Sequence, residues 1–296
     1  MAEPTPTAPV VIAAKGSRLT DSTHDRTAAT NRDYAVALAR AFAGATIFGL
    51  PLLMTMEMWT LGHSLGPLML LQFSLANMIM LLGLSKVAGF EESHRFLDDL
   101  LDALAAYAVG ALVSIALLML LGVIGTDTAP GEAVGKIAIQ AVPASFGAMI
   151  GARMMGQGEV VEKGEQWRET YAGQLFLFAA GALFLSFTIA PTEEVLLISF
   201  QITPWHGLLL VLLSIVLLHL ILHVVGFSGQ DERIGAGGDL LWRQTLPGYG
   251  ISVLMSVYIL WTFGNTTGLD WPHLVMAVAV LALPAAIGAG IARIVV

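Results

Sequence analysis

The sequence has no cysteine and very little charge. None of its 296 residues is Cys, and only 12% are Asp, Glu, Lys or Arg. The absence of cysteine excludes disulfide bonds, thiolate nucleophiles and thiolate metal ligands. The chain also lacks a phosphate-binding glycine loop, a His-Glu-x-x-His motif and a Gly-x-Ser-x-Gly motif. We therefore expect a protein that is not an enzyme and that needs no cofactor or resident metal.

The charged residues also indicate which classes of partner the protein can bind. The formal net charge is −8, and the charged residues sit in a few loops without forming a basic face. Because nucleic acids are bound by clustered basic residues, we expect no nucleic-acid partner.

The chain is instead rich in apolar sequence. Hydrophobic residues make up 56% of it and the mean hydropathy is +0.77, which is more than the core of a soluble domain can bury. A membrane-spanning helix needs about 20 apolar residues. Eight segments meet this requirement, so we predict an all-α membrane protein whose main partner is the lipid bilayer. The predicted spans are residues 35–60, 66–88, 103–124, 132–155, 171–200, 205–226, 244–264 and 271–295.

The basic residues predict the orientation. When the spans are numbered in order, all of the 14 Lys and Arg except Lys136 fall on one side of the membrane. Basic residues are enriched in cytoplasmic loops, so both termini are predicted to be cytoplasmic, in a multi-pass protein of the bacterial inner (plasma) membrane. Four tryptophans fall at the opposite ends of the spans, where an indole ring suits the outer interface: Trp59, Trp205, Trp261 and Trp271.

The sequence contains an internal repeat. A shift of 137 residues places Tyr34 on Tyr171, Gly44 on Gly181, Thr55 on Thr192, Glu57 on Glu194 and Pro67 on Pro204, and later Pro143 and Gly147 pair with Pro284 and Gly288. We predict two four-helix repeats, residues 34–155 and 171–296, joined by a cytoplasmic linker at 156–170. A disordered cytoplasmic tail, residues 1–33, precedes them. An even number of spans gives both repeats the same orientation about a pseudo-two-fold axis.

The duplication has a plainer interpretation as well, in which it serves only to make a stable eight-helix bundle. The small-residue patterns Gly147-x-x-x-Gly151 and Gly288-x-x-x-Ala292 are typical of close helix packing, between halves or between protomers. The sequence therefore leaves open whether the protein forms a homo-oligomer.

These features resemble a family of bacterial integral membrane proteins that is known only as a domain of unknown function. The resemblance rests on the two four-span halves and on an acid at the outer end of each first helix. It rests also on Pro-Thr-Glu-Glu at residues 191–194 and on Gly-Phe-Glu-Glu-Ser at residues 89–93. It covers roughly residues 30–296 and omits the tail. The resemblance implies the eight-span topology and no particular activity.

Acids at equivalent positions are the first candidate site. Glu57, with Thr55, and the pair Glu193 and Glu194, with Thr192, fall in the outer half of predicted spans. Acids are rare within spans unless something polar or cationic meets them, so these residues could form an acidic vestibule for cations or protons. The alternative is that the helices end near these glutamates, which then simply meet water.

Two further polar residues lie within predicted spans. Asn77 is in the second span and could line an aqueous path, although an interhelical hydrogen bond is the more ordinary role. His219 lies one turn before His223 in the sixth span. That spacing suits a metal site or a proton relay, but packed histidines explain it too.

The leading hypothesis is a channel or secondary transporter for a small cation or a proton. The candidate path comprises Glu57, Glu193, Glu194, Thr55, Thr192, Asn77 and His219. The alternative is a non-transporting sensor, scaffold or partner subunit. Its contact surface would be an amphipathic helix in the second cytoplasmic loop, with Phe96, Leu97, Leu100, Leu101 and Leu104 on its apolar face.

Overall fold

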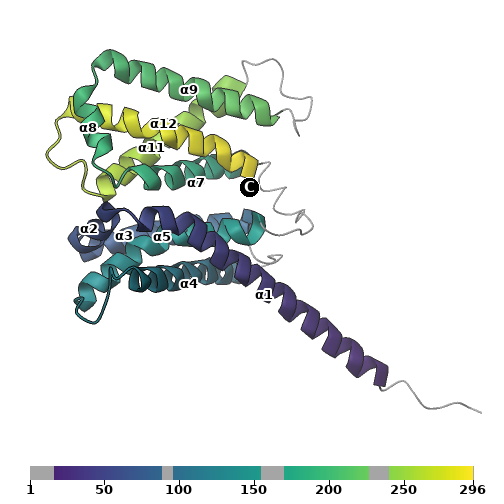
Figure 1. The fold of residues 1–296 in the computed structure, drawn as a ribbon. Helices are drawn as coiled ribbons and strands as arrows, with labels where there is room; N and C mark the ends of the chain where they lie inside the picture. The colour runs from purple at the N-terminus through teal and green to yellow at the C-terminus, as the bar shows by residue number, and fades with distance from the viewer. Residues whose placement is uncertain (1–16, 89–95, 155–169, 227–239, 296) are drawn as a thin grey trace, which may run out of the picture.

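The protein is all-helical in the parts of the chain that the computed structural model describes, which are residues 17–88, 96–154, 170–226 and 240–295. Eight long helices alternate with short connections, and no strand occurs in these ranges (Figure 1). Two short helices, α2 (Met56–Ser64) and α8 (Glu194–Gln201), follow the first long helix of each half. The long helices are α1 (Ser17–Leu53), α3 (Pro67–Ala88), α4 (Phe96–Leu120), α5 (Pro130–Met154), α7 (Tyr171–Ile189), α9 (Pro204–Gly226), α11 (Leu246–Thr262) and α12 (Trp271–Val295).

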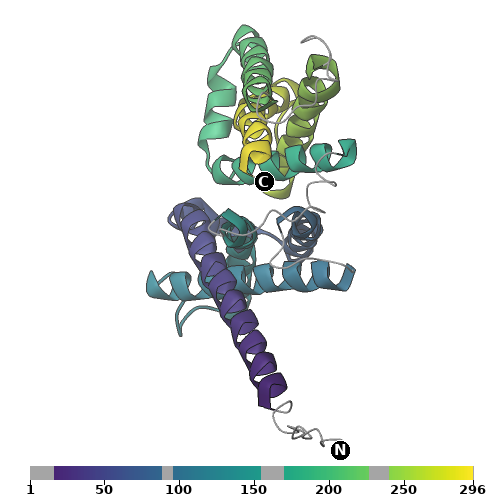
Figure 2. The same cartoon turned by 90° about the vertical axis from the view of Figure 1, so that its right-hand side faces the viewer.

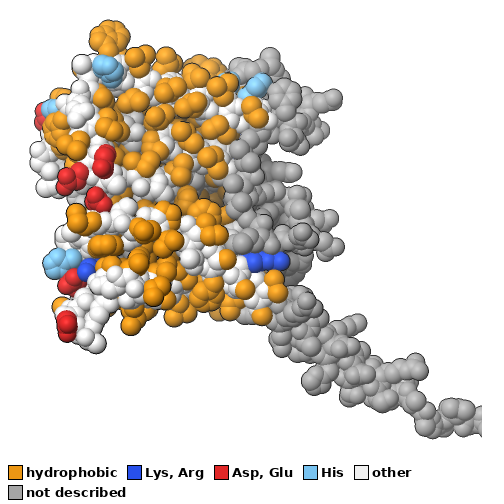
Figure 3. Space-filling model, viewed as in Figure 1, with side chains coloured by type: hydrophobic (Ala, Val, Ile, Leu, Met, Phe, Trp, Pro, Cys, Tyr) orange, Lys and Arg blue, Asp and Glu red, His pale blue; other side chains and the backbone are white. Residues whose placement is uncertain are grey.

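Each long helix has a stretch long and apolar enough to cross a membrane, eight in all within the described ranges. Hydrophobic side chains cover the broad middle of the molecule in the space-filling view, and acidic side chains gather toward one end (Figure 3). Such a band is what a protein exposes to hydrocarbon. The prediction of eight spanning helices is confirmed.

Two predicted spans, residues 35–60 and 171–200, are too long. The apolar stretches end at Leu53 and Ile189, and separate short helices follow. Proline explains both breaks. Pro51 cannot donate a backbone hydrogen bond and disturbs the last turn of α1. Pro191 directly follows Ala190, the C-cap residue of α7, and a helix usually ends at the residue before a proline.

Two other differences concern the cytoplasm-assigned segments. The predicted disordered tail, residues 1–33, is partly helical, because α1 begins at Ser17; residues 1–16 lie outside the described ranges. The predicted interfacial helix at residues 96–104 is not a separate element, because α4 starts at Phe96 and continues to Leu120. Phe96, Leu97 and Leu101 are exposed there and extend the apolar surface of a spanning helix. The linker at 156–170 lies outside the described ranges except for Thr170.

The helices form two bundles of four, which Figure 2 shows one above the other. In the first bundle α1 packs mainly against α5, and α4 and α3 also pack against α5. In the second bundle α7 packs mainly against α12, and α9 and α11 also pack against α12. The short helices α2 and α8 lie at the same end of the molecule, so α1 and α7 run in the same direction (Figure 1).

Glycine permits a close helix contact in each bundle. A Cβ atom added to Gly44 of α1 would lie 2.7 Å from the Cα of Gly151 in α5. A Cβ atom added to Gly181 of α7 would lie 2.6 Å from the Cβ of Ala292 in α12. Real side chains do not approach so closely, so these backbones touch only because small residues stand on both sides.

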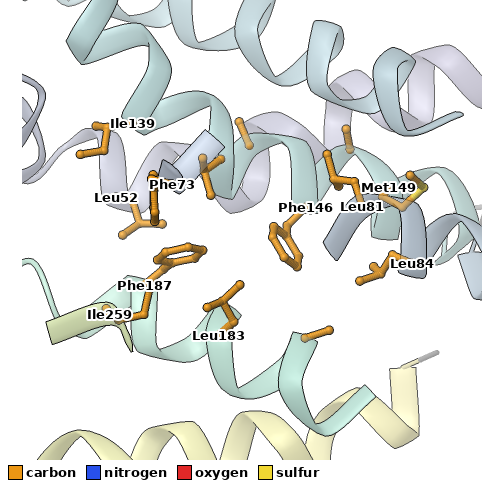
Figure 4. Close-up of a cluster of buried hydrophobic side chains, with 14 of the residues drawn as sticks. Leu52, Phe73, Leu81, Leu84, Ile139, Phe146, Met149, Leu183, Phe187 and Ile259 are labelled. Carbon is orange, nitrogen blue, oxygen red and sulfur yellow. The ribbon is translucent and has the colours of Figure 1, made fainter. Parts of the chain in front are cut away.

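The two bundles meet through an apolar interface that is rich in phenylalanine. Phe73 of α3 packs edge-to-face on Phe187 of α7, with ring centroids 5.1 Å apart. Phe146 of α5 and Phe48 of α1 contact Phe184 of α7, with centroids 6.2 and 5.2 Å apart. Figure 4 shows Phe73, Phe146 and Phe187 converging between the bundles. This contact surface therefore resembles the core of a protein more than the wall of an aqueous pore.

We expect the Gly44→Ala and Gly181→Ala substitutions to destabilise the protein by about 1–3 kcal/mol each, because the added methyl group has no room and the helices must separate. The midpoint of thermal unfolding in detergent measures the effect. Gly250→Ala is the matched control, because a Cβ at Gly250 meets nothing within 4 Å. It should leave the midpoint unchanged or raise it, since Ala is the better helix former. An equal loss in all three variants would contradict the close contact.

Candidate functional site

The acids that the sequence singles out lie beyond the ends of spanning helices. Glu57 is in the first turn of α2 and Glu194 begins α8, while Glu193 is the residue before it. Glu193 and Glu194 are exposed and Glu57 is partly exposed. Side chains of this type gather at the end of the molecule that carries α2 and α8 (Figure 3). The acids thus belong to a water-facing surface at one end and not to the apolar middle of the spans.

The two threonines that precede these acids cap the helices before them. The Thr55 hydroxyl donates to the Leu52 carbonyl over 2.7 Å, and the Thr192 hydroxyl donates to the Ile189 carbonyl over 2.8 Å. Neither Thr55 nor Glu193, which hold the N-cap positions of α2 and α8, makes a side-chain capping bond. Each threonine therefore closes the helix break with two bonds to one carbonyl, because its backbone N–H also donates to that oxygen over 3.1 Å.

One of these acids is electrostatically distinct. The pKa of the Glu194 carboxyl is lowered, chiefly because the Thr192 hydroxyl lies in hydrogen-bonding position and also because the backbone N–H of Glu194 donates to it. The same hydroxyl lies 2.8 Å from the Ile189 carbonyl. Stabilisation of the carboxylate keeps Glu194 negatively charged to lower pH than an ordinary glutamate.

Asn77 lies in the interior of the first bundle and is 1% exposed. Its Nδ2 donates to the Ser145 Oγ over 3.0 Å, which joins α3 to α5, and the Ser145 hydroxyl donates onward to the Val142 carbonyl. The Oδ1 of Asn77 has no hydrogen-bond partner. The amide therefore links two spanning helices and still presents one free acceptor to the interior.

Gln140 of α5 was missed by the sequence reasoning. It is 1% exposed, and neither its Nε2 nor its Oε1 has a hydrogen-bond partner. A polar side chain in the middle of a spanning segment is the signal that could have found it. The unmet hydrogen-bonding capacity of this amide is the largest of any buried side chain in the described ranges.

The cytoplasm-assigned end of the same bundle is also polar. The hydroxyl of Ser85 in α3 lies 3.3 Å from Asp99 Oδ1 and 3.5 Å from Asp102 Oδ2, both in the first turns of α4. Asp99 is 6% exposed. Asp99 is thus enclosed between α3 and α4 and does not lie on a solvated helix face.

The second bundle is less polar at the equivalent positions. Under the repeat alignment Gln140 corresponds to Leu281, Ser145 to Ala286 and Ser85 to Leu222. Asn77 corresponds to Ser214, whose hydroxyl donates to the Leu210 carbonyl of its own helix over 2.7 Å. The buried atoms without partners in this bundle are the hydroxyls of Ser186 and Tyr258. The second bundle joins its helices through other polar side chains, His219 with Thr245 and Arg293 with Gln244. Within the described ranges, what distinguishes the first bundle is its buried amides with unmet hydrogen-bonding capacity.

His219 lies in the second bundle, apart from the other candidates. Its Nδ1 is 2.9 Å from the buried Thr245 Oγ1, and its ring stacks on that of His223 with centroids 6.4 Å apart. Thr245 ends the π-helical turn η1 (Leu241–Thr245), which leads into α11 just before Pro247. Within the described ranges no group of three His, Asp or Glu side chains is placed to hold a metal ion. The histidine thus secures α9 to the start of α11.

In the part of the chain that the structure describes, eight helices are long and apolar enough to span a membrane, so the protein is a helical, multi-pass integral membrane protein. Comparison with protein families agrees, because residues 37–296 match the family described as "Putative integral membrane protein (DUF2391)", and the chain belongs to that family. The resemblance drawn from the sequence motifs is confirmed. No curated protein and no solved structure shows a significant match to the chain.

Thr192→Val should raise the pKa of the Glu194 carboxyl toward the ordinary value of 4.5, because the variant removes the largest cause of the lowered pKa. A pH titration of the side-chain carboxyl carbons by NMR, with labelled glutamate, measures this shift. Thr188→Val serves as the control, since the Thr188 hydroxyl donates to the Leu185 carbonyl. An unchanged Glu194 titration in Thr192→Val would show that the hydroxyl does not act on this acid.

Proposed function

We propose that the protein moves a small cation or a proton across the bilayer, and that the path runs through the polar interior of the first bundle. The observation that carries the proposal is the pair of buried amides, Gln140 and Asn77, with unmet hydrogen-bonding capacity inside membrane-spanning helices. Such a group costs several kcal/mol in hydrocarbon unless a partner meets it. Water or a passing cation would supply that partner.

The polar groups of this bundle lie at successive depths. Asn77 and Ser85 are eight residues apart on α3, which corresponds to about 12 Å along the helix axis. The Tyr107 hydroxyl of α4 is 3.5 Å from the Ser74 Oγ, one turn before Asn77 on α3. Leu81, which is fully buried, lies between Asn77 and Ser85. Passage therefore requires this leucine to move, as expected of a gated path.

The acids at the α2 and α8 end would serve the entrance of the path. Glu57, Glu193 and Glu194 are outside the spans and concentrate negative charge at one end of the molecule, which raises the local concentration of cations. The lowered pKa of Glu194 favours this role, because the carboxylate stays charged in mildly acidic medium. On this proposal the acids attract the ion and the first bundle conducts it.

The sequence and the helix arrangement together support a proposal for the orientation in the membrane. We infer two four-helix repeats of the same orientation, because the same pairs of helices pack in both bundles and α1 and α7 run in parallel. The basic residues favour cytoplasmic termini in a bacterial inner membrane. Trp205 and Trp271 are exposed at the starts of α9 and α12, which suits an outer interface at the acidic end.

A second candidate function is a non-transporting membrane sensor, scaffold or partner subunit. The apolar interface between the bundles favours it, since the pseudo-two-fold interface, where duplicated transporters commonly carry their substrate, is filled here by phenylalanine. This candidate treats the buried amides as structural. It predicts that no ion flux depends on Gln140.

Gln140→Leu should lower ion or proton flux into proteoliposomes by at least about tenfold, equivalent to about 1.4 kcal/mol in the barrier. The corresponding residue of the second bundle is Leu281, so we expect the helix packing to accommodate leucine at position 140. Ser214→Ala is the matched control in the second bundle and should leave flux unchanged. Equal flux in Gln140→Leu and the native protein would contradict the path, and absence of flux for protons and common cations alike would contradict transport.

A further inference from the structure

We propose that an apolar recess between the two bundles binds one acyl chain of a membrane phospholipid. The recess has a volume of about 270 Å³ and is lined by side chains of α1, α3, α5, α7 and α12. Phe48, Phe146 and Phe184 form part of its wall, together with Ile150, Ala180 and Ile291. It is separate from the polar interior of the first bundle and from the acids at the α2 and α8 end.

The recess opens where hydrocarbon surrounds the protein. Its lining residues belong to the membrane-spanning parts of their helices, and Ile291 at its rim is 40% exposed. Figure 3 shows this side of the molecule hollowed between α12 and α1, within the band of hydrophobic side chains. Because the lining is apolar, water gains no hydrogen bonds there and a hydrocarbon chain is the favoured occupant.

Small and large residues together give the recess its shape. Gly181 of α7 lies against Gly288 of α12, and Ala180 and Ala292 stand beside them, so one side of the space lacks bulk. The aromatic pairs Phe48–Phe184 and Phe146–Phe184 close the other side. An apolar cavity of about 150 Å³ accommodates a benzene molecule. The larger space found here accommodates a segment of one extended chain.

Basic residues flank the recess at one end, where a phospholipid would place its phosphate. Arg293 follows the lining residues Ile291 and Ala292 at the end of α12, and its guanidinium donates to the Gln244 side chain. Arg40 of α1 lies one turn before Gly44, and its backbone carbonyl faces Gly151 of α5, the residue after the lining residue Ile150. Both are on the side away from the acids, so an anionic headgroup would meet positive charge there.

Native mass spectrometry of the detergent-purified protein tests the proposal. We expect one phospholipid to remain bound to the native protein through delipidating detergent washes. Ile291→Trp, which fills the mouth of the recess, should reduce the lipid-bound fraction at least about fivefold, since the indole occupies space that the acyl chain would fill. Val275→Trp is the control, because Val275 is exposed on the same helix but does not line the recess.

A second variant keeps the test independent of folding defects. Arg40→Gln leaves the recess intact and should lower the preference for anionic over zwitterionic phospholipid in the same measurement. Loss of lipid to the same extent in Val275→Trp and Ile291→Trp would overturn the proposal, as would retention of lipid in Ile291→Trp. A retained species without an acyl chain would also overturn it. None of these outcomes depends on ion flux.

Discussion

Polar groups inside a bilayer must find their partners within the protein, and this constraint governs the structure. The backbone meets it by forming helices whose breaks fall beyond the spans, after Leu53 and Ile189. Most buried hydroxyls meet it by bonding a carbonyl of their own helix, as Ser114 does to Gly110 and Ser256 does to Ser252. The amides of Gln140 and Asn77 are the marked exceptions. Buried amides without hydrogen-bond partners indicate that a polar species occupies the interior or that the amides have a functional role. The proposed path includes both, because water or a cation would bind these amides as it passes.

The two bundles share a packing scheme but differ in chemistry. In both, the first helix lies closely against the last through glycine, and the other two helices pack around the last. Phenylalanine fills the contact between them, so any passage for ions belongs inside a bundle and not at the axis between bundles. Gln140, Ser145 and Ser85 of the first bundle correspond to leucine or alanine in the second, whereas Asn77 corresponds to Ser214. Duplication followed by divergence would leave one half to conduct and the other to support it.

Much of the fold follows from the sequence, because hydropathy and length are direct consequences of the bilayer. Eight spans and the family were predicted from these features and from short motifs. The breaks near Pro51 and Pro191 were not placed correctly, since apolar residues continue past both prolines and composition alone does not show where a helix turns. The candidate functional site was harder to predict from the sequence. Sequence reasoning found Asn77 and the acids, but it left open whether Glu57 and Glu194 lie within the spans or meet water where the helices end. It overlooked Gln140, whose importance lies in the absence of a hydrogen-bond partner and so appears only when the neighbours are known.

If ions or protons cross through the first bundle, its interior must hold a polar species at the depth of the membrane. A high-resolution structure determined in lipid would reveal that species. We expect ordered water or a cation within hydrogen-bonding distance of the Gln140 amide and of the Asn77 Oδ1. A dry interior, in which the Gln140 side chain instead bonds a backbone carbonyl of a neighbouring helix, would contradict it.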